Sequence, residues 1–230
     1  MVLPIRDIQP RESFPFVTIG LIAVNLALFF YEVSLGHHLE RFFEQNAFIP
    51  VHYFQAGGWL ADGRAILTSM FLHGGWSHLF GNMLYLWIFG DNVEDRLGHL
   101  GYLVFYIFCG WMATLAHAFS DPASPVPSIG ASGAIAGVLG AYLVMFPRAR
   151  VLTLVPIGMF MRVSELPALA VLGLWFVLQL FSGTLSLGAA GHAAATGVAW
   201  WAHIGGFVVG MVLGAIFGKR RRPQRLVEMR

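Results

Sequence analysis

Six long apolar stretches limit the folds that are open to this chain. Of its 230 residues, 57% are hydrophobic and only 11% are charged, whereas roughly a quarter of the residues in a soluble domain are charged. The longer stretches approach the roughly 20 apolar residues that a helix needs to cross a bilayer core. We therefore expect an all-α membrane protein, a bundle of six transmembrane helices. The stretches lie at about Val17–Val33, Leu67–Phe89, Leu100–His117, Ser132–Phe146, Pro167–Phe181 and Ala199–Gly218.

The basic residues are unevenly divided between the two sides of this predicted bundle. Six spans place both termini on one side, where twelve of the 14 lysines and arginines fall, while Arg41 and Arg64 fall opposite. Because basic loops stay in the cytoplasm, we expect cytoplasmic termini and a location in the cell's inner (plasma) membrane. The predicted layout is a cytoplasmic segment at 1–16, a six-span domain at 17–218 and a basic cytoplasmic tail at 219–230.

The segment from Ser34 to Ile66 is the longest one between predicted spans, and it falls on the outer side. Aromatic residues are mixed with charged ones along it. Such a mixture suits a structure that lies in the lipid headgroup layer, and it equally suits a surface loop packed on the bundle. The sequence leaves both interpretations open.

The fourth stretch is too short to cross the membrane alone. From Ser132 to Phe146 it is roughly 22 Å long as a helix, against a bilayer core of about 30 Å. The sequence Pro147-Arg148-Ala149-Arg150 holds its inner end at the cytoplasmic surface. Ser132, at the other end, must then lie below the outer surface, and the loop before it must dip in against protein or water.

Ser132 stands where this loop turns into the helix, with Gly130 before it and Gly133 directly after it. These glycines leave the hydroxyl open to a substrate. A helix N-terminus also provides unpaired N–H groups that can stabilise developing negative charge. A serine that only bonds its own helix is the ordinary alternative, but a position at the bottom of a wet depression favours a nucleophile.

A serine nucleophile needs a base, and His203 in the sixth stretch lies at a depth similar to that of Ser132. Gly206 and Gly210 follow it on one helix face, and Gly133 lies on a small-residue face of the fourth stretch. Such faces let helix backbones approach closely in lipid. We therefore expect Ser132 and His203 to come within hydrogen-bond distance.

The sequence offers no third member for this pair. A Ser–His–Asp triad needs an acid buried beside the histidine, and only Glu32 falls within a predicted span, at its very end. We expect a dyad in which packing, rather than a carboxylate, orients the His203 ring. His192 is expected outside the membrane or at its surface.

His78 and Asn82 form a second polar cluster, four residues apart on one face of the second predicted span. Polar groups at this depth are costly and usually functional. With the Ser132 N–H, they could bind the oxyanion of a tetrahedral intermediate. An interhelical hydrogen bond that only holds the bundle together is the alternative. No metal site is expected, because a His-Glu-x-x-His pattern is absent from the sequence and two imidazoles with an amide bind zinc poorly.

Three motifs together resemble the rhomboid intramembrane serine proteases, of the compact six-span bacterial type. They are Gly130-Ala131-Ser132-Gly133, the spacing His73…His78…Asn82, and Ala202-His203-Ile204-Gly205-Gly206. The resemblance covers essentially the whole chain. It implies Ser132 as nucleophile and His203 as general base. It further implies His78 and Asn82 as oxyanion stabilisers, with a supporting role for His73.

One position departs from the family pattern. Some members carry a tyrosine four residues after the nucleophile, packed against the histidine, and this chain has Ala136 there. Another aromatic residue must then hold the His203 ring, or the ring is held less tightly.

The resemblance implies an endopeptidase that cleaves membrane-anchored proteins in or near the outer end of their transmembrane segment. Its partners would be single-span or other membrane-protein substrates and the lipid bilayer, with no cofactor and no nucleic acid. A non-catalytic rhomboid-like protein that binds membrane clients is the main alternative, although it would be expected to lack the serine or the histidine. A small-solute channel would need polar residues in the cytoplasmic half of its spans, which these stretches lack.

Substrate entry is predicted to involve the fifth stretch, Pro167–Phe181. It is rich in bulky side chains, and Gly173 is its only glycine. A helix held by large side chains has fewer close backbone contacts to lose than one with a glycine stripe. We hypothesise that this helix yields to admit a substrate, and that the following loop, Ser182–Val198, moves as a cap.

Overall fold

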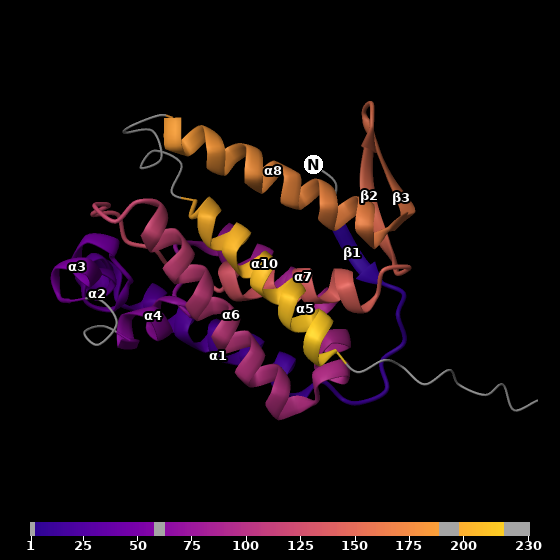
Figure 1. Ribbon diagram of the computed structural model, residues 1–230, viewed down its shortest axis with the longest axis horizontal. Coiled ribbons are helices and arrows are strands. Elements are labelled where there is room, and N and C mark those ends of the chain that lie inside the picture. Colours follow the sequence, from indigo (N-terminus) through magenta and orange to yellow (C-terminus); the bar gives the residue numbers. More distant parts are fainter. Residues whose placement is uncertain (1–2, 58–62, 189–197, 219–230) are drawn as a thin grey trace, which may run out of the picture.

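The computed structural model (Figure 1) describes residues 3–57, 63–188 and 198–218, and most of these residues are helical. The basic tail at 219–230 lies outside the described residues. The long helices are α1 (Phe16–Ser34), α5 (Trp76–Leu97), α6 (His99–Ser120), α7 (Ser132–Met145), α8 (Ala168–Gly188) and α10 (Trp200–Phe217). Between α1 and α5 lie η1 (Gly36–His38), α2 (Leu39–Asn46), α3 (Pro50–Gln55) and α4 (Gly63–Ser69).

Four helices in the described part of the chain are long and apolar enough to cross a membrane: α1, α6, α8 and α10. The predicted helical membrane fold is confirmed. Helix α7 has 14 residues, as short as the sequence indicated. Helix α5 has 22 residues, but its last two turns carry Asp91, Glu94, Asp95 and Arg96. The number of six spans is compatible with this arrangement and stays a prediction.

The second predicted span, Leu67–Phe89, has different bounds in the structure. Helix α4 ends at Ser69 and α5 begins only at Trp76, because Gly75, with φ of +156°, interrupts the backbone between them. At the other end α5 continues past Phe89, the predicted end of this span. It stops at Leu97, where Gly98 adopts a left-handed φ of +74°.

A small antiparallel sheet was not predicted from the sequence. Its strands are β1 (Leu3–Asp7), β2 (Arg150–Ile157) and β3 (Phe160–Pro167), in the order β1-β2-β3. Strands β2 and β3 form a hairpin between α7 and α8, visible beside the start of α8 in Figure 1. The N-terminal segment, predicted at 1–16, therefore contains a strand, β1, that pairs with β2 in a distant part of the chain.

Helix α7 lies at the centre of the bundle, and every residue from Gly133 to Tyr142 is buried. A helix that is apolar on all sides belongs in such a position. Glycines set its approach to α10: a Cβ added at Gly206 or Gly210 would overlap the carbonyl of Gly133 or Gly137, respectively. The predicted small-residue faces thus meet backbone to backbone.

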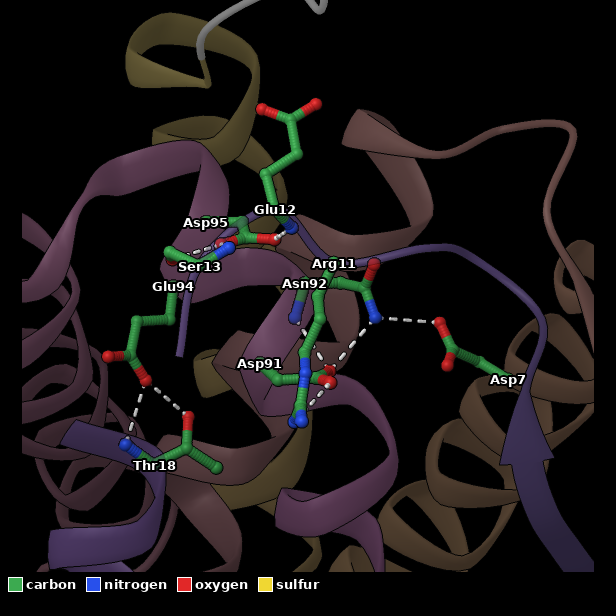
Figure 2. A network of polar contacts seen from close by, with 9 residues as sticks. All are labelled: Asp7, Arg11, Glu12, Ser13, Thr18, Asp91, Asn92, Glu94 and Asp95. Carbon is green, nitrogen blue, oxygen red and sulfur yellow. Dashed lines mark hydrogen bonds and ion pairs between the residues drawn. The ribbon is translucent and has the colours of Figure 1, made fainter. Parts of the chain in front are cut away.

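The C-terminal end of α5 is tied to the start of α1 by charged side chains (Figure 2). The buried Glu94 carboxylate accepts hydrogen bonds from the backbone N–H groups of Val17 and Thr18, at 3.0 and 2.8 Å, and from the Thr18 hydroxyl. Pro15, the N-cap residue of α1, offers no side-chain cap. Glu94 therefore supplies from another helix the cap that the α1 N-terminus needs.

Asp7, at the end of β1, is the other buried carboxylate of this region, 8% exposed. It accepts hydrogen bonds from the Tyr142 hydroxyl on α7 at 2.9 Å and from the Asn92 amide on α5 at 2.8 Å. Burial raises the pKa of Asp7 from 3.8 to about 6, and Asp91 nearby acts in the same direction while the Tyr142 hydrogen bond opposes it. Asp7 thus joins the sheet, α5 and α7 through one carboxyl group.

We predict that Asp7→Asn changes the pH dependence of stability. Between about pH 4 and pH 6 the folded protein holds the Asp7 proton more tightly than the unfolded chain does, so wild-type stability falls as the pH rises through this window. Asparagine keeps an oxygen acceptor and removes the titration. Thermal unfolding in detergent should show the Tm of Asp7→Asn gaining on that of the wild type by a few degrees between pH 4 and pH 7.

The matched control is Glu165→Gln, which changes a carboxylate on the exposed strand β3. Parallel Tm curves for Asp7→Asn and the wild type across this pH range would contradict the prediction.

Candidate active site

Ser132 and His203 are hydrogen-bonded in the structure. The Ser132 Oγ and the His203 Nε2 lie 2.8 Å apart. Ser132 is the first residue of α7, and His203 lies in the first turn of α10. Their contact follows from the glycine packing of these two helices, as the sequence indicated.

The loop before Ser132 is fixed by the outer segment of the chain. Phe48 and Ser128 exchange two backbone hydrogen bonds, of 3.2 and 2.7 Å, and the Gly130 N–H donates to the Ser69 carbonyl at 2.8 Å. Phe48 and Tyr53 are fully buried in a second apolar cluster against α6. Of the two interpretations of the segment from Ser34 to Ile66, packing on the bundle therefore holds for these residues. Residues 58–62 lie outside the described part.

Gly130 must be glycine for two reasons. Its φ of +128° lies in a region that other residues rarely adopt, and an added Cβ would lie 2.7 Å from the His78 Nε2. The same added atom would lie 3.6 Å from the Ser132 Oγ. The His78 ring and the serine hydroxyl therefore face the same small space above Gly130.

His78 presents a hydrogen-bond donor to this space. Its Nδ1 accepts the Gly74 N–H at 3.4 Å. A neutral imidazole with an accepting Nδ1 carries its proton on Nε2, the atom nearest to Gly130. This arrangement suits a donor aimed beside Ser132.

Asn82 is held by His73. The Asn82 amide donates to the His73 Nε2 at 3.0 Å, and the His73 Nδ1 lies 3.3 Å from the Phe71 carbonyl. His73 is itself fixed by its backbone N–H, which donates to the Glu32 carboxylate at 3.3 Å. His73 precedes α5 and is buried, so it orients Asn82 without lining the cavity.

These groups open into one cavity of about 1080 Å³. Ser132, His203, His78 and Asn82 all line it, together with residues 124–129 and the aromatic rings of α8 and α10. This volume lies slightly above the usual range of ligand-binding pockets, roughly 300–1,000 Å³. It is large enough for an extended peptide segment.

Gln179 on α8 was missed by the sequence reasoning. Its Oε1 lies 2.8 Å from the His203 Nδ1, so the histidine has a partner on each ring nitrogen. One signal was present: Gln179 is the only polar side chain between Pro167 and Phe181. A single polar residue within an apolar span is a functional candidate.

Tryptophans of α8 and α10, rather than a tyrosine at position 136, pack against the His203 ring. The ring of Trp175 on α8 lies 5.9 Å from the His203 ring, and the ring of Trp200 lies 6.3 Å from it, edge-on. Ala136 is buried and lines the cavity. The His203 ring is therefore packed from the α8 side.

A family model described as the rhomboid domain matches residues 61–220. The chain belongs to the rhomboid family. It is 32% identical to Rhomboid protein 1, mitochondrial, of Saccharomyces cerevisiae over 170 residues, which make up 70% of this chain and 44% of that protein. It is 31% identical to Rhomboid-like protein 11, chloroplastic, of Arabidopsis thaliana over 194 residues, 81% of this chain and 63% of that protein.

A shorter match joins this rhomboid chain to a protein named as a protease. It is 45% identical to Rhomboid protease GluP of Bacillus subtilis over 78 residues, which make up 34% of this chain and 15% of that protein. The chain spans about half the length of the first two relatives. Family membership and the apolar helices together make it a multi-pass membrane protein.

The first part of the predicted cap at Ser182–Val198 of this rhomboid is helical. Helix α8 continues to Gly188, and the residues between Phe181 and Gly188 contain no proline that would end it. Residues 189–197, which include His192, lie outside the described part. The ring of Trp175 on α8 packs on His203, so a substitution at Trp175 would affect the histidine as well as any movement of the helix.

Proposed function

We propose that this rhomboid is an intramembrane serine endopeptidase that cleaves membrane-anchored proteins. The observation that carries the proposal is the 2.8 Å contact between the Ser132 hydroxyl and the His203 imidazole, facing a cavity within a bundle of apolar helices. Two relatives are named as a protease or a putative protease, GluP and YdcA of Bacillus subtilis.

The chemistry follows from the positions of the two side chains. Ser132 Oγ attacks the scissile carbonyl carbon while its proton passes to the His203 Nε2. The tetrahedral intermediate collapses, and the departing amine takes the proton from His203. A water molecule then gives a proton to His203 and attacks the acyl ester. As the ester bond to Ser132 breaks, His203 returns this proton to the Ser132 Oγ, and the carboxylic acid is released.

The oxyanion of each intermediate would be bound by neutral donors. We assign this role to the His78 Nε2–H, the Asn82 amide and the Ser132 N–H, with His73 as the residue that positions Asn82. Donors that are already oriented need no rearrangement when the charge forms.

The proposed orientation has both termini in the cytoplasm of a cell with an inner (plasma) membrane. The excess of arginine and lysine on one side supports it. In this orientation the cavity opens toward the outer side, so the substrate would be cut in or near the outer end of its transmembrane segment.

We predict that Ser132→Ala and His203→Ala each abolish cleavage of a model single-span substrate by the purified protein. Loss of either member of such a pair removes roughly 10⁶-fold of turnover in soluble serine proteases. The Tm in detergent should remain nearly unchanged, because both side chains border a cavity. Cleavage is followed by gel electrophoresis of the substrate.

Ser34→Ala and His52→Ala are the matched controls, since both residues lie away from the cavity, and both variants should cleave like the wild type. Full activity in Ser132→Ala would refute the serine mechanism. Binding of the substrate by the wild type with no cleavage would favour a non-catalytic protein that binds membrane clients.

A second prediction separates the oxyanion role of Asn82 from a structural one. Asn82→Ala removes the proposed donor and should lower kcat about 100- to 1,000-fold, with a smaller effect on KM. His73→Ala breaks the same hydrogen bond but leaves the Asn82 amide in place, so its kcat should fall less. Both variants should lose similar stability.

The measurements are kcat and KM per folded molecule, alongside Tm. Equal turnover in the wild type and Asn82→Ala, with a lower Tm in both variants, would make the hydrogen bond structural only.

A third prediction concerns α8 as the substrate gate. Only 22% of the most apolar 18-residue stretch of α8 is buried inside the protein, against 44% of the corresponding stretch of α6. A Cβ added at Gly183 would lie 3.5 Å from the Trp200 Cβ, a distance that a disulfide can bridge. In Gly183→Cys/Trp200→Cys, oxidation should stop cleavage of a membrane-anchored substrate, while Ser132 still reacts with a small soluble ester probe.

The control is the same double variant after reduction. Both forms lack the Trp200 ring, so a difference between them reports only the effect of the disulfide. The native Cys109 is buried and should not interfere. Equal cleavage before and after reduction would rule out α8 as the gate.

A further inference from the structure

Gln179 is a buried amide that contacts the base of the proposed dyad. Its side chain is 7% exposed, and its Oε1 lies 2.8 Å from the His203 Nδ1. The other ring nitrogen, Nε2, faces the Ser132 hydroxyl at the same distance. Ser132, His203 and Gln179 thus form a continuous chain of hydrogen bonds across α7, α10 and α8.

The direction of this chain follows from proton counting. A neutral imidazole carries one proton, and Nε2 can accept the Ser132 proton only if that proton resides on Nδ1. A buried Nδ1–H requires an acceptor, and the Gln179 Oε1 is placed to provide it. When His203 gains the Ser132 proton on Nε2, the Nδ1–H bond to Gln179 remains.

We propose that Gln179 is a positioning residue that holds His203 in the tautomer and the ring orientation needed to receive the Ser132 proton. The proposal rests on the proposed protease function. In a Ser–His–Asp triad a carboxylate has this task. Here a neutral amide performs it, in a setting where an ionised group would be expensive.

The same helix face holds the ring from a second direction. Trp175 lies four residues before Gln179, on the same face of α8, and its ring packs 5.9 Å from that of His203. Phe176 stacks on Phe207 of α10 at 4.5 Å. Helix α8 therefore orients the base only while it is docked against α10, and proton transfer requires that docked state even if α8 moves to admit a substrate.

A plain interhelical hydrogen bond would also explain the contact, since such bonds stabilise membrane bundles. The two explanations differ in what they affect. A structural bond contributes to stability alone, whereas a positioning bond also sets the proton location on His203 and the rate of the chemical step.

The test compares three variants. Gln179→Met keeps the length of the side chain but removes the acceptor, and its kcat should fall about 10- to 100-fold with KM little changed. Gln179→Glu restores an oxygen acceptor and should recover most of the turnover. A carboxylate also favours protonated imidazole, so the acidic limb of its pH–rate profile should move to higher pH. Thr184→Val, which removes an exposed α8 hydroxyl bonded within its own helix, should match the wild type.

A spectroscopic measurement keeps the proposal testable without turnover. In ¹⁵N NMR spectra, with the His203 signals assigned by their absence in His203→Ala, the wild type should show the Nδ1–H tautomer. Gln179→Met should shift the population toward Nε2–H. An unchanged tautomer together with wild-type kcat in Gln179→Met would overturn the proposal.

These measurements distinguish failure of the proposed protease function from failure of the positioning role of Gln179. If neither the wild type nor any variant cleaves a substrate, the protease function fails, and the tautomer measurement still decides whether Gln179 sets the proton on His203. If the wild type cleaves and Gln179→Met cleaves equally well, only the positioning role fails.

Discussion

The geometry of the candidate active site depends on the backbone contact between α7 and α10. Gly206 and Gly210 lie directly against the carbonyls of Gly133 and Gly137, so no side chain separates the two helices. Ser132 and His203 stand at the first turns of these same helices. A methyl group at Gly206 or Gly210 would push the helices apart, and the 2.8 Å contact between the two side chains would lengthen with them.

Helix α8 is attached to this rigid pair in a different way. It reaches α10 through the side chains of Trp175, Phe176 and Gln179. Side-chain contacts can separate and reform by rotamer changes, whereas interlocked backbones cannot. The bundle thus combines a fixed serine–histidine pair with a more exposed helix that completes the surroundings of the histidine.

Sequence reasoning found the parts of this site that local chemistry marks. Ser132 between glycines, His203 before a glycine stripe and the His78–Asn82 spacing are all visible along one helix face or in one loop. Gln179 was not found, because its role depends on how α8 docks, and an apolar helix carries little information about its rotation. The small sheet escaped for a similar reason: the pairing of Leu3–Asp7 with β2 joins segments about 145 residues apart, and neither segment predicts the other.

The two ends of the bundle treat charge in opposite ways. Where α5 meets the start of α1, the buried Glu94 and the more exposed Asp95 are ionisable groups that accept hydrogen bonds from backbone N–H groups. Around Ser132, the side chains that contact the serine–histidine pair or are proposed to bind the oxyanion are imidazoles and amides, and Asp121, a carboxylate that also lines the cavity, is exposed. In the proposed reaction an imidazolium and an oxyanion form together and disappear together. A serine–histidine pair that is neutral at rest therefore carries no desolvation penalty for a permanent buried charge between turnovers. A carboxylate in place of Gln179 would stabilise the imidazolium more strongly, but it would be a lasting charge within apolar helices. The Gln179 amide stabilises the imidazolium less strongly than a carboxylate would, but it adds no charge beside His203 in the resting state.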